Sequence, residues 1–120
     1  MKPQDFVIAY MSSIDVPYSE LFKTVRQRNG RIIKKRTYNG VHLDLIRMSL
    51  AYVLRFGANL QFSKIALVCG YSSHSSAVHA TQKADDYLLV RDPLFLTYYE
   101  KINELWHELQ NEKQTCISRL

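Results

Sequence analysis

The sequence is short of the residues that interrupt or crosslink a chain. Its 120 residues include only four glycines, three prolines and two cysteines. So little glycine and proline excludes a linker-like or low-complexity chain. Because Cys69 and Cys116 form no Cys-x-x-Cys pair, we expect no thiol redox motif. A chain of this length buries about two-thirds of its unfolded surface, so the fold should be a single domain that rests on its hydrophobic core.

Long apolar runs are also absent. No stretch nears the roughly 18 apolar residues of a membrane span, and Asp5 falls where a secretory leader needs its apolar region. Together with the unpaired cysteines, this predicts a cytoplasmic protein. The chain lacks Gly-x-x-x-x-Gly-Lys-Ser/Thr, so we expect no nucleotide-binding ATPase module and no nucleotide cofactor. We also expect no metal, because His74 and His79 are five residues apart and a helix turns about 140° over that step.

Acidic residues are missing from one segment. No carboxylate lies between Leu21 and Leu43, whereas seven of the 16 lysines and arginines do. The net charge of +5 is therefore carried by residues 1–43, and residues 44–120 are neutral. Asn29-Gly30 and Asn39-Gly40 are turn signals, so we expect a basic loop. Such a charge excess favours an anionic partner, although a solvated surface without a partner is the alternative.

Apolar residues at helical spacing predict an all-α domain of about six helices, without strands. The expected helices lie near residues 6–10, 17–29, 43–57, 59–69, 73–90 and from 92 onward. Asn59 should cap the fourth helix, Gly70 should end it, and Ser72 or Ser73 should cap the fifth. Within the fifth helix, His79 is expected on the interior side. We divide the chain into residues 1–43, the core 44–90, and a C-terminal helix and tail 91–120.

A polar cluster opens the fifth helix, directly after a tight turn that contains Gly70. Its members are Ser72, Ser73, His74, Ser75 and Ser76. Two helices joined in this way form a helix-turn-helix pattern. The first turn of a DNA-recognition helix needs short side chains that hydrogen-bond base edges or phosphates, and Ser and His do both. A serine-rich capping loop without a ligand is the alternative interpretation.

The residues around this cluster resemble a known family, the carboxy-terminal DNA-binding domain of the bacterial replication initiator DnaA. The resemblance spans about residues 47–87. The family signature runs approximately Ser-Leu-x-x-Ile-Gly-x-x-Phe-Gly-Gly-Arg-Asp-His-Ser/Thr-Thr-Val-x-His-Ala, and this chain aligns to it without gaps over residues 61–80. The identical positions are Ile65, Gly70, His74, Ser75, His79 and Ala80. Arg47 and Arg55 also fall on basic positions of the family.

The resemblance implies a Trp-repressor-like helix-turn-helix that binds double-stranded DNA in replication or its regulation, in a bacterial or phage protein. It implies that His74, Ser75 and Ser73 contact base edges, and that Ser76 and Arg55 contact phosphates. The loop cations would follow the adjacent minor groove; they are Arg31, Lys34, Lys35 and Arg36. Where the family has Arg-Asp before the histidine, this chain has Ser72-Ser73, so its target should differ from the initiator's own box.

Other functions remain open from the sequence. An interaction or adaptor protein that keeps the DNA-binding fold and binds a replication or mobile-element protein is the main alternative. RNA binding through the basic loop and Tyr38 is a minor one. We expect no enzyme, because Asp85, Asp86 and Asp92 show no recognisable metal spacing and Ser73 beside His74 is no catalytic pair. The aromatic stripe of the last helix is predicted to be core, with room for a homodimer face.

Overall fold

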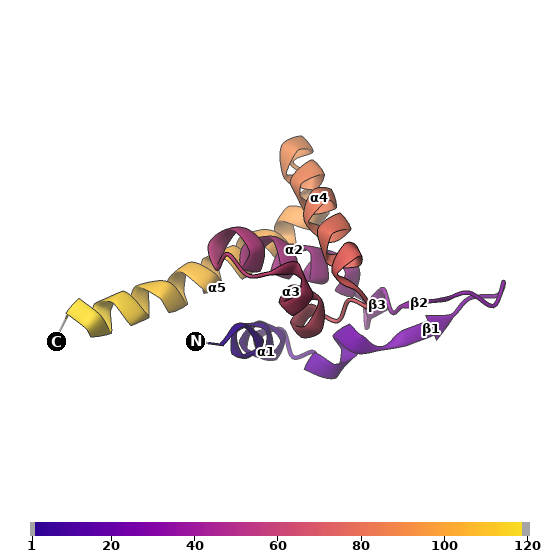
Figure 1. The fold of residues 1–120 in the computed structure, drawn as a ribbon, viewed down its shortest axis with the longest axis horizontal. Helices are drawn as coiled ribbons and strands as arrows, with labels where there is room; N and C mark the ends of the chain where they lie inside the picture. The colour runs from indigo at the N-terminus through magenta and orange to yellow at the C-terminus, as the bar shows by residue number, and fades with distance from the viewer. Residues whose placement is uncertain (1, 119–120) are drawn as a thin grey trace.

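The chain is mostly helical, with two small hairpins near its start (Figure 1). The structure is a computed structural model that describes residues 2–118, with side chains as far as residue 111. Its elements are α1 (Pro3–Ser13), the 3-10 helix η1 (Tyr18–Phe22), β1 (Thr24–Arg26), β2 (Ile32–Lys34), β3 (Thr37–Tyr38), β4 (Val41–His42), α2 (Leu43–Gly57), α3 (Phe62–Cys69), α4 (His74–Val90) and α5 (Pro93–Ser118). Within these residues, no helix is both long and apolar enough to cross a membrane.

Helix α2 is the centre of the core. It contacts α3, α4 and α5, and its side chains at helical spacing are fully buried. Those side chains are Leu43, Ile46, Leu50 and Leu54. Helix α4 lies close against this core because small residues, Ala77, Ala80 and Ala84, face it. The predictions for the helices at 43–57 and 73–90 are confirmed in position.

The predicted helix over 17–29 is wrong beyond Phe22. After the single 3-10 turn of η1 the chain becomes extended, and β1 pairs antiparallel with β2. Asn29-Gly30 closes this hairpin instead of ending a helix: the Gln27 amide donates to the Arg31 carbonyl at 2.8 Å, and Gly30 has φ +84. This is a three-residue hairpin loop with a left-handed glycine. The structure therefore has five α-helices and η1 within residues 2–118, rather than six α-helices.

The expectation of no strands is wrong for the whole basic segment. β3 and β4 form a second hairpin around the two-residue loop Asn39-Gly40. Both loop residues have positive φ, +47 and +81, which is the type I′ turn that Asn-Gly favours. The expected basic loop is thus two consecutive hairpins. In Figure 1 the β1–β2 hairpin, called the ribbon below, projects from the helical body on the side opposite the C-terminal half of α5.

The ends of α3 and α4 are partly as predicted. Gly70 ends α3 in the left-handed conformation (φ +91), and the Ser73 hydroxyl caps α4 by accepting the Ser76 amide at 3.3 Å. Asn59, however, does not cap α3. It has φ +53 and lies in the connection after α2, whereas Gln61 holds the cap position without a side-chain bond.

Candidate nucleic-acid interface

The first turn of α4 stands at the surface with its polar side chains outward. Ser72, Ser73, His74 and Ser75 are exposed, and Ser76 is half-buried. Because the Ser73 hydroxyl is held by the Ser76 amide, and the two hydroxyls lie 3.2 Å apart, these two serines order the turn. His74 and Ser75 have no such bond among the described residues and remain available to a ligand. Helix N-termini favour anions through their unpaired amides and their positive dipole end.

Close backbone packing and two hydrogen bonds connect the α3–α4 turn and its neighbours to the segment that precedes the ribbon. The backbone of Gly70 lies so close to Leu21 that a Cβ at Gly70 would come within 2.2 Å of the Leu21 carbonyl oxygen. That oxygen accepts Arg47 Nε at 2.9 Å. The Tyr18 hydroxyl of η1 also donates to the Val68 carbonyl of α3 at 2.7 Å. The chain that leads into β1 is therefore fixed to α2, α3 and the α3–α4 turn at once.

Glu20 anchors the base of the ribbon. Its carboxylate is almost fully buried and binds Lys23 Nζ at 2.9 Å and Lys35 Nζ at 3.1 Å. The hydrogen bond from Lys23, followed by that from Lys35, holds the pKa of Glu20 below its ordinary value. Lys35 also lies over the Tyr38 ring, 5.1 Å from its centre. Of the four predicted loop cations, Lys35 is thus committed to the protein itself.

The other predicted cations occupy different positions. Arg31 is exposed at the tip of the ribbon, and Arg36 is exposed where β2 leads to β3. Lys34 is half-buried, and burial lowers its pKa, helped by the nearby charge of Arg47. Arg55 lies in the last turn of α2, where its Nη1 donates to the Leu60 carbonyl at 3.1 Å and its guanidinium covers the Phe62 ring at 4.4 Å. It is not brought together with the ribbon.

Two adjacent hollows lie between the ribbon and α4. One hollow, of about 200 Å³, is lined by Ile33, Lys34, Arg36, Asp44, Arg47, Met48 and Tyr71. A second, of about 240 Å³, is lined by Met48, Tyr71, Ser76, His79, Ala80 and Lys83. Because the two hollows share Met48 and Tyr71, they are adjacent, and together we call them the trough. Lys34 and Arg36 line the first hollow and Lys83 lines the second, and among the described residues Asp44 is the one carboxylate that lines either of them.

A buried positive charge lies beneath the trough. Arg47 is 2% exposed, and among the described side chains it has no carboxylate within 4.0 Å and its Nη2 has no hydrogen-bond partner. Burial lowers the pKa of this guanidinium, opposed by Tyr71 and Asp44. A charge that is shielded from water acts over a longer range than a surface charge. Arg47 therefore adds to the positive potential of the trough.

Several residues of this surface were not predicted from the sequence. The predicted interior position of His79 is wrong: its side chain is exposed and lines the trough. Lys83 and Tyr71 were not predicted as site residues, nor was Met48. A signal was present, because Ser76, His79 and Lys83 lie at i, i+3 and i+7 and so share one face of α4.

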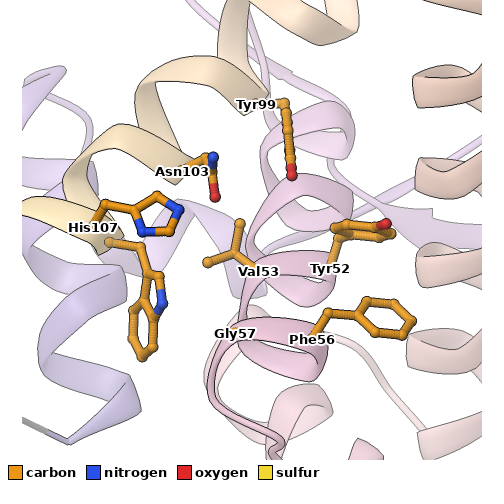
Figure 2. Close-up of a pocket in the computed structure, with 8 residues that line it drawn as sticks. Tyr52, Val53, Phe56, Gly57, Tyr99, Asn103 and His107 are labelled. Carbon is orange, nitrogen blue, oxygen red and sulfur yellow. The ribbon is translucent and has the colours of Figure 1, made fainter. Parts of the chain in front are cut away.

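A separate aromatic hollow of about 220 Å³ lies between α2 and α5 (Figure 2). Tyr52 and Phe56 line it from α2, and Tyr99, Asn103 and His107 line it from α5. It lies toward the end of α2 that is remote from the trough. Within the described residues, no cluster of three His, Cys, Asp or Glu side chains could hold a metal ion.

Comparison of the chain with models of protein families, with curated proteins and with solved structures finds no match.

Proposed function

We propose that this protein binds double-stranded DNA sequence-specifically, with α3, the Gly70 turn and α4 as a Trp-repressor-like helix-turn-helix. The process is DNA replication or its regulation, and the chain supplies no ATPase of its own. The observation that carries the proposal is the trough. Its lining includes Lys34 of the ribbon and Arg36 at one end, and Ser76 and Lys83 of α4 at the other, so one continuous anionic ligand reaches both ends. A duplex has such a continuous row of phosphates.

Affinity and site choice reside in different parts of this surface. Lys34, Arg36 and Lys83 supply phosphate contacts, which release counterions and make binding depend on salt. His74 and Ser75, which are exposed beyond the Ser73 cap, read base edges. Ser73 and Ser76 hold the turn and offer their remaining hydrogen-bonding capacity to phosphate. Tyr71 and Met48 form the floor against which the sugar-phosphate backbone packs.

Selection from a random duplex library at two salt concentrations tests this function. We expect enrichment of one sequence, with a preference that persists as salt rises while total affinity falls. Binding to duplex without enrichment of any sequence would contradict sequence-specific recognition and leave only the electrostatic contact with phosphates. A protein that binds no duplex even at low salt would contradict the proposal altogether.

One observation favours the adaptor protein as a second candidate. At the far end of α4, Leu89 and Val90 are 83% and 71% exposed, and Leu94 at the start of α5 is 45% exposed. A group of large apolar side chains at the surface is typical of protein contact sites. Under this alternative, the unaltered protein captures a partner protein, and Leu89→Ser with Val90→Ser abolishes that capture. Under either function, the same double variant leaves duplex binding unchanged, so the capture assay separates the two.

A further inference from the structure

The two faces of the ribbon are electrically different. In a strand, successive side chains point to opposite faces, and cross-strand partners share a face. The register pairs Thr24 with Lys34 and Arg26 with Ile32 on one face, and Val25 with Ile33 on the other. The Lys35 amide donates to the Lys23 carbonyl at 2.9 Å, so the ladder continues and these two lysines belong to the face of Val25.

The face of Val25 is neutralised by the protein itself. Both of its lysines bind the buried carboxylate of Glu20, and Lys35 in addition covers Tyr38. These cations already have partners, and moving them to a phosphate would leave the Glu20 carboxylate buried without a counter-ion. This face therefore has little free charge to offer.

The opposite face has two cations that no described carboxylate neutralises and an exposed apolar side chain. Within the described part of the chain, each cation donates only to a backbone carbonyl, Arg26 Nη1 to Gly30 at 3.4 Å and Lys34 Nζ to Phe22 at 3.5 Å. Among the described residues, neither Arg26 nor Lys34 has a carboxylate within 4.0 Å. Between them stands Ile32, 57% exposed. Lys34 also lines the trough, so this face is continuous with the surface that leads to α4. We call it the Arg26 face.

We propose that the Arg26 face of the ribbon enters a groove of the duplex, with Arg26 and Lys34 on phosphates and Ile32 in apolar contact with the groove interior. The inference rests on the proposed function and deepens it. A two-stranded ribbon has the width to enter a groove, and apolar side chains on DNA-binding arms contact sugars or wedge between base steps. The ribbon stands away from the helical body (Figure 1). Its isoleucine is 57% exposed and belongs to neither hydrophobic cluster of the described side chains. A duplex supplies phosphates for the two cations and an apolar groove surface for the isoleucine.

Matched charge variants on the two faces test the assignment. Arg26→Gln with Lys34→Gln should lower the slope of log affinity against log salt by about 1.8, because each phosphate contact contributes about 0.9. Lys23→Gln with Lys35→Gln removes the same formal charge from the other face and should change the slope by less than about 0.5. Equal losses from both pairs, or a larger loss from the second, would overturn the assignment of the face.

A second pair of variants leaves all charges in place. Ile32→Thr and Val25→Thr both keep a β-branched side chain in the ribbon, so the hairpin tolerates both alike. We expect Ile32→Thr to weaken duplex binding about fivefold, the effect of losing partial burial of one aliphatic side chain, and Val25→Thr to leave it unchanged. Binding that falls equally in both variants, or in neither, removes Ile32 from the contact.

The outcomes separate this inference from the proposed function. If His74→Ala alters base preference while the two faces of the ribbon respond alike, the function stands and the assignment of the face fails. If the unaltered protein binds no duplex at low salt, both fail together. Far-ultraviolet circular dichroism of each variant confirms that the helical body, which dominates that spectrum, is intact.

Discussion

Gly70 offers the most direct test of how the α3–α4 turn is attached to the ribbon. Replacing it by alanine has two separate costs. The left-handed conformation at φ +91 disfavours alanine by about 1–2 kcal/mol. In addition, the new Cβ would lie 2.2 Å from the Leu21 carbonyl oxygen and 2.7 Å from its carbon, so the backbone must move.

That movement breaks a second interaction. The same Leu21 oxygen accepts Arg47 Nε at 2.9 Å, and hydrogen bonds to charged groups contribute about 1.5–3 kcal/mol. Gly70→Ala should therefore lower the free energy of unfolding by about 3–5 kcal/mol, a large part of the total stability of a small domain. The melting temperature should fall by about 12–20 °C, since about 1 kcal/mol corresponds to roughly 4 °C at this size.

Gly40 is the matched control. It also has positive φ, +81, but a Cβ there would meet nothing within 4 Å. Gly40→Ala should cost only the conformational term of about 1–2 kcal/mol. Asparagine tolerates the left-handed conformation, so Gly40→Asn should be nearly neutral, whereas Gly70→Asn retains the clash. The measurement is urea unfolding followed by circular dichroism. If Gly70→Ala and Gly40→Ala differ by less than about 1 kcal/mol, the close packing on Leu21 does not stabilise the fold as argued.

Three further changes test the site and the ribbon. His74→Ala should relax base preference at one position by about 1–3 kcal/mol and leave binding to random duplex intact, as measured by competition with single-base variants of the selected site. Glu20→Gln should lower the melting temperature above pH 4.5, the ordinary pKa of the carboxyl. Because the folded pKa of Glu20 is depressed, the stability it contributes is present above that value and disappears as the pH falls through the folded pKa, so the two melting curves should converge in acid. Lys83→Gln should lower the salt slope by about 0.9 without changing the selected sequence.

The helices were predictable because each buries a stripe that its own sequence repeats. In α2, the spacing of Leu43, Ile46, Leu50 and Leu54 and the final Gly57 define both the face and the length. The same logic, applied fully to α4, places Ala77, Ala80, Thr81 and Ala84 inward and His79 outward. The wrong prediction for His79 came from its immediate neighbours, which in a helix point in other directions.

The hairpins were missed for a different physical reason. β1 and β2 have three residues each and no buried side chain, and β3 and β4 have only two residues each, so none of them shows apolar alternation. The remaining signal was in the turns, since Asn29-Gly30 and Asn39-Gly40 favour tight hairpin loops as strongly as they end helices. The trough could not be predicted at all, because Met48 of α2 and Tyr71 of the α3–α4 turn line the same hollows only through tertiary packing.

The arrangement of charge limits how strongly one copy of the chain responds to salt. Lys23 and Lys35 bind Glu20, which leaves five other cations within residues 23–36. Lys83 lines the end of the trough on α4. The five are Arg26, Arg28, Arg31, Lys34 and Arg36. Six phosphate contacts give a slope of about 5 when log affinity is plotted against log salt.

This value distinguishes a monomer from a dimer on the DNA. Two copies joined through α5, each with its own ribbon, would give a slope near 10 on a site of two half-sites. We expect a slope of about 5 or less on a short duplex that carries a single site. A steeper slope there, with sedimentation showing one protein per duplex, would mean that cations outside these six also contact phosphates. The set of phosphate-binding cations drawn from the structure would then be incorrect.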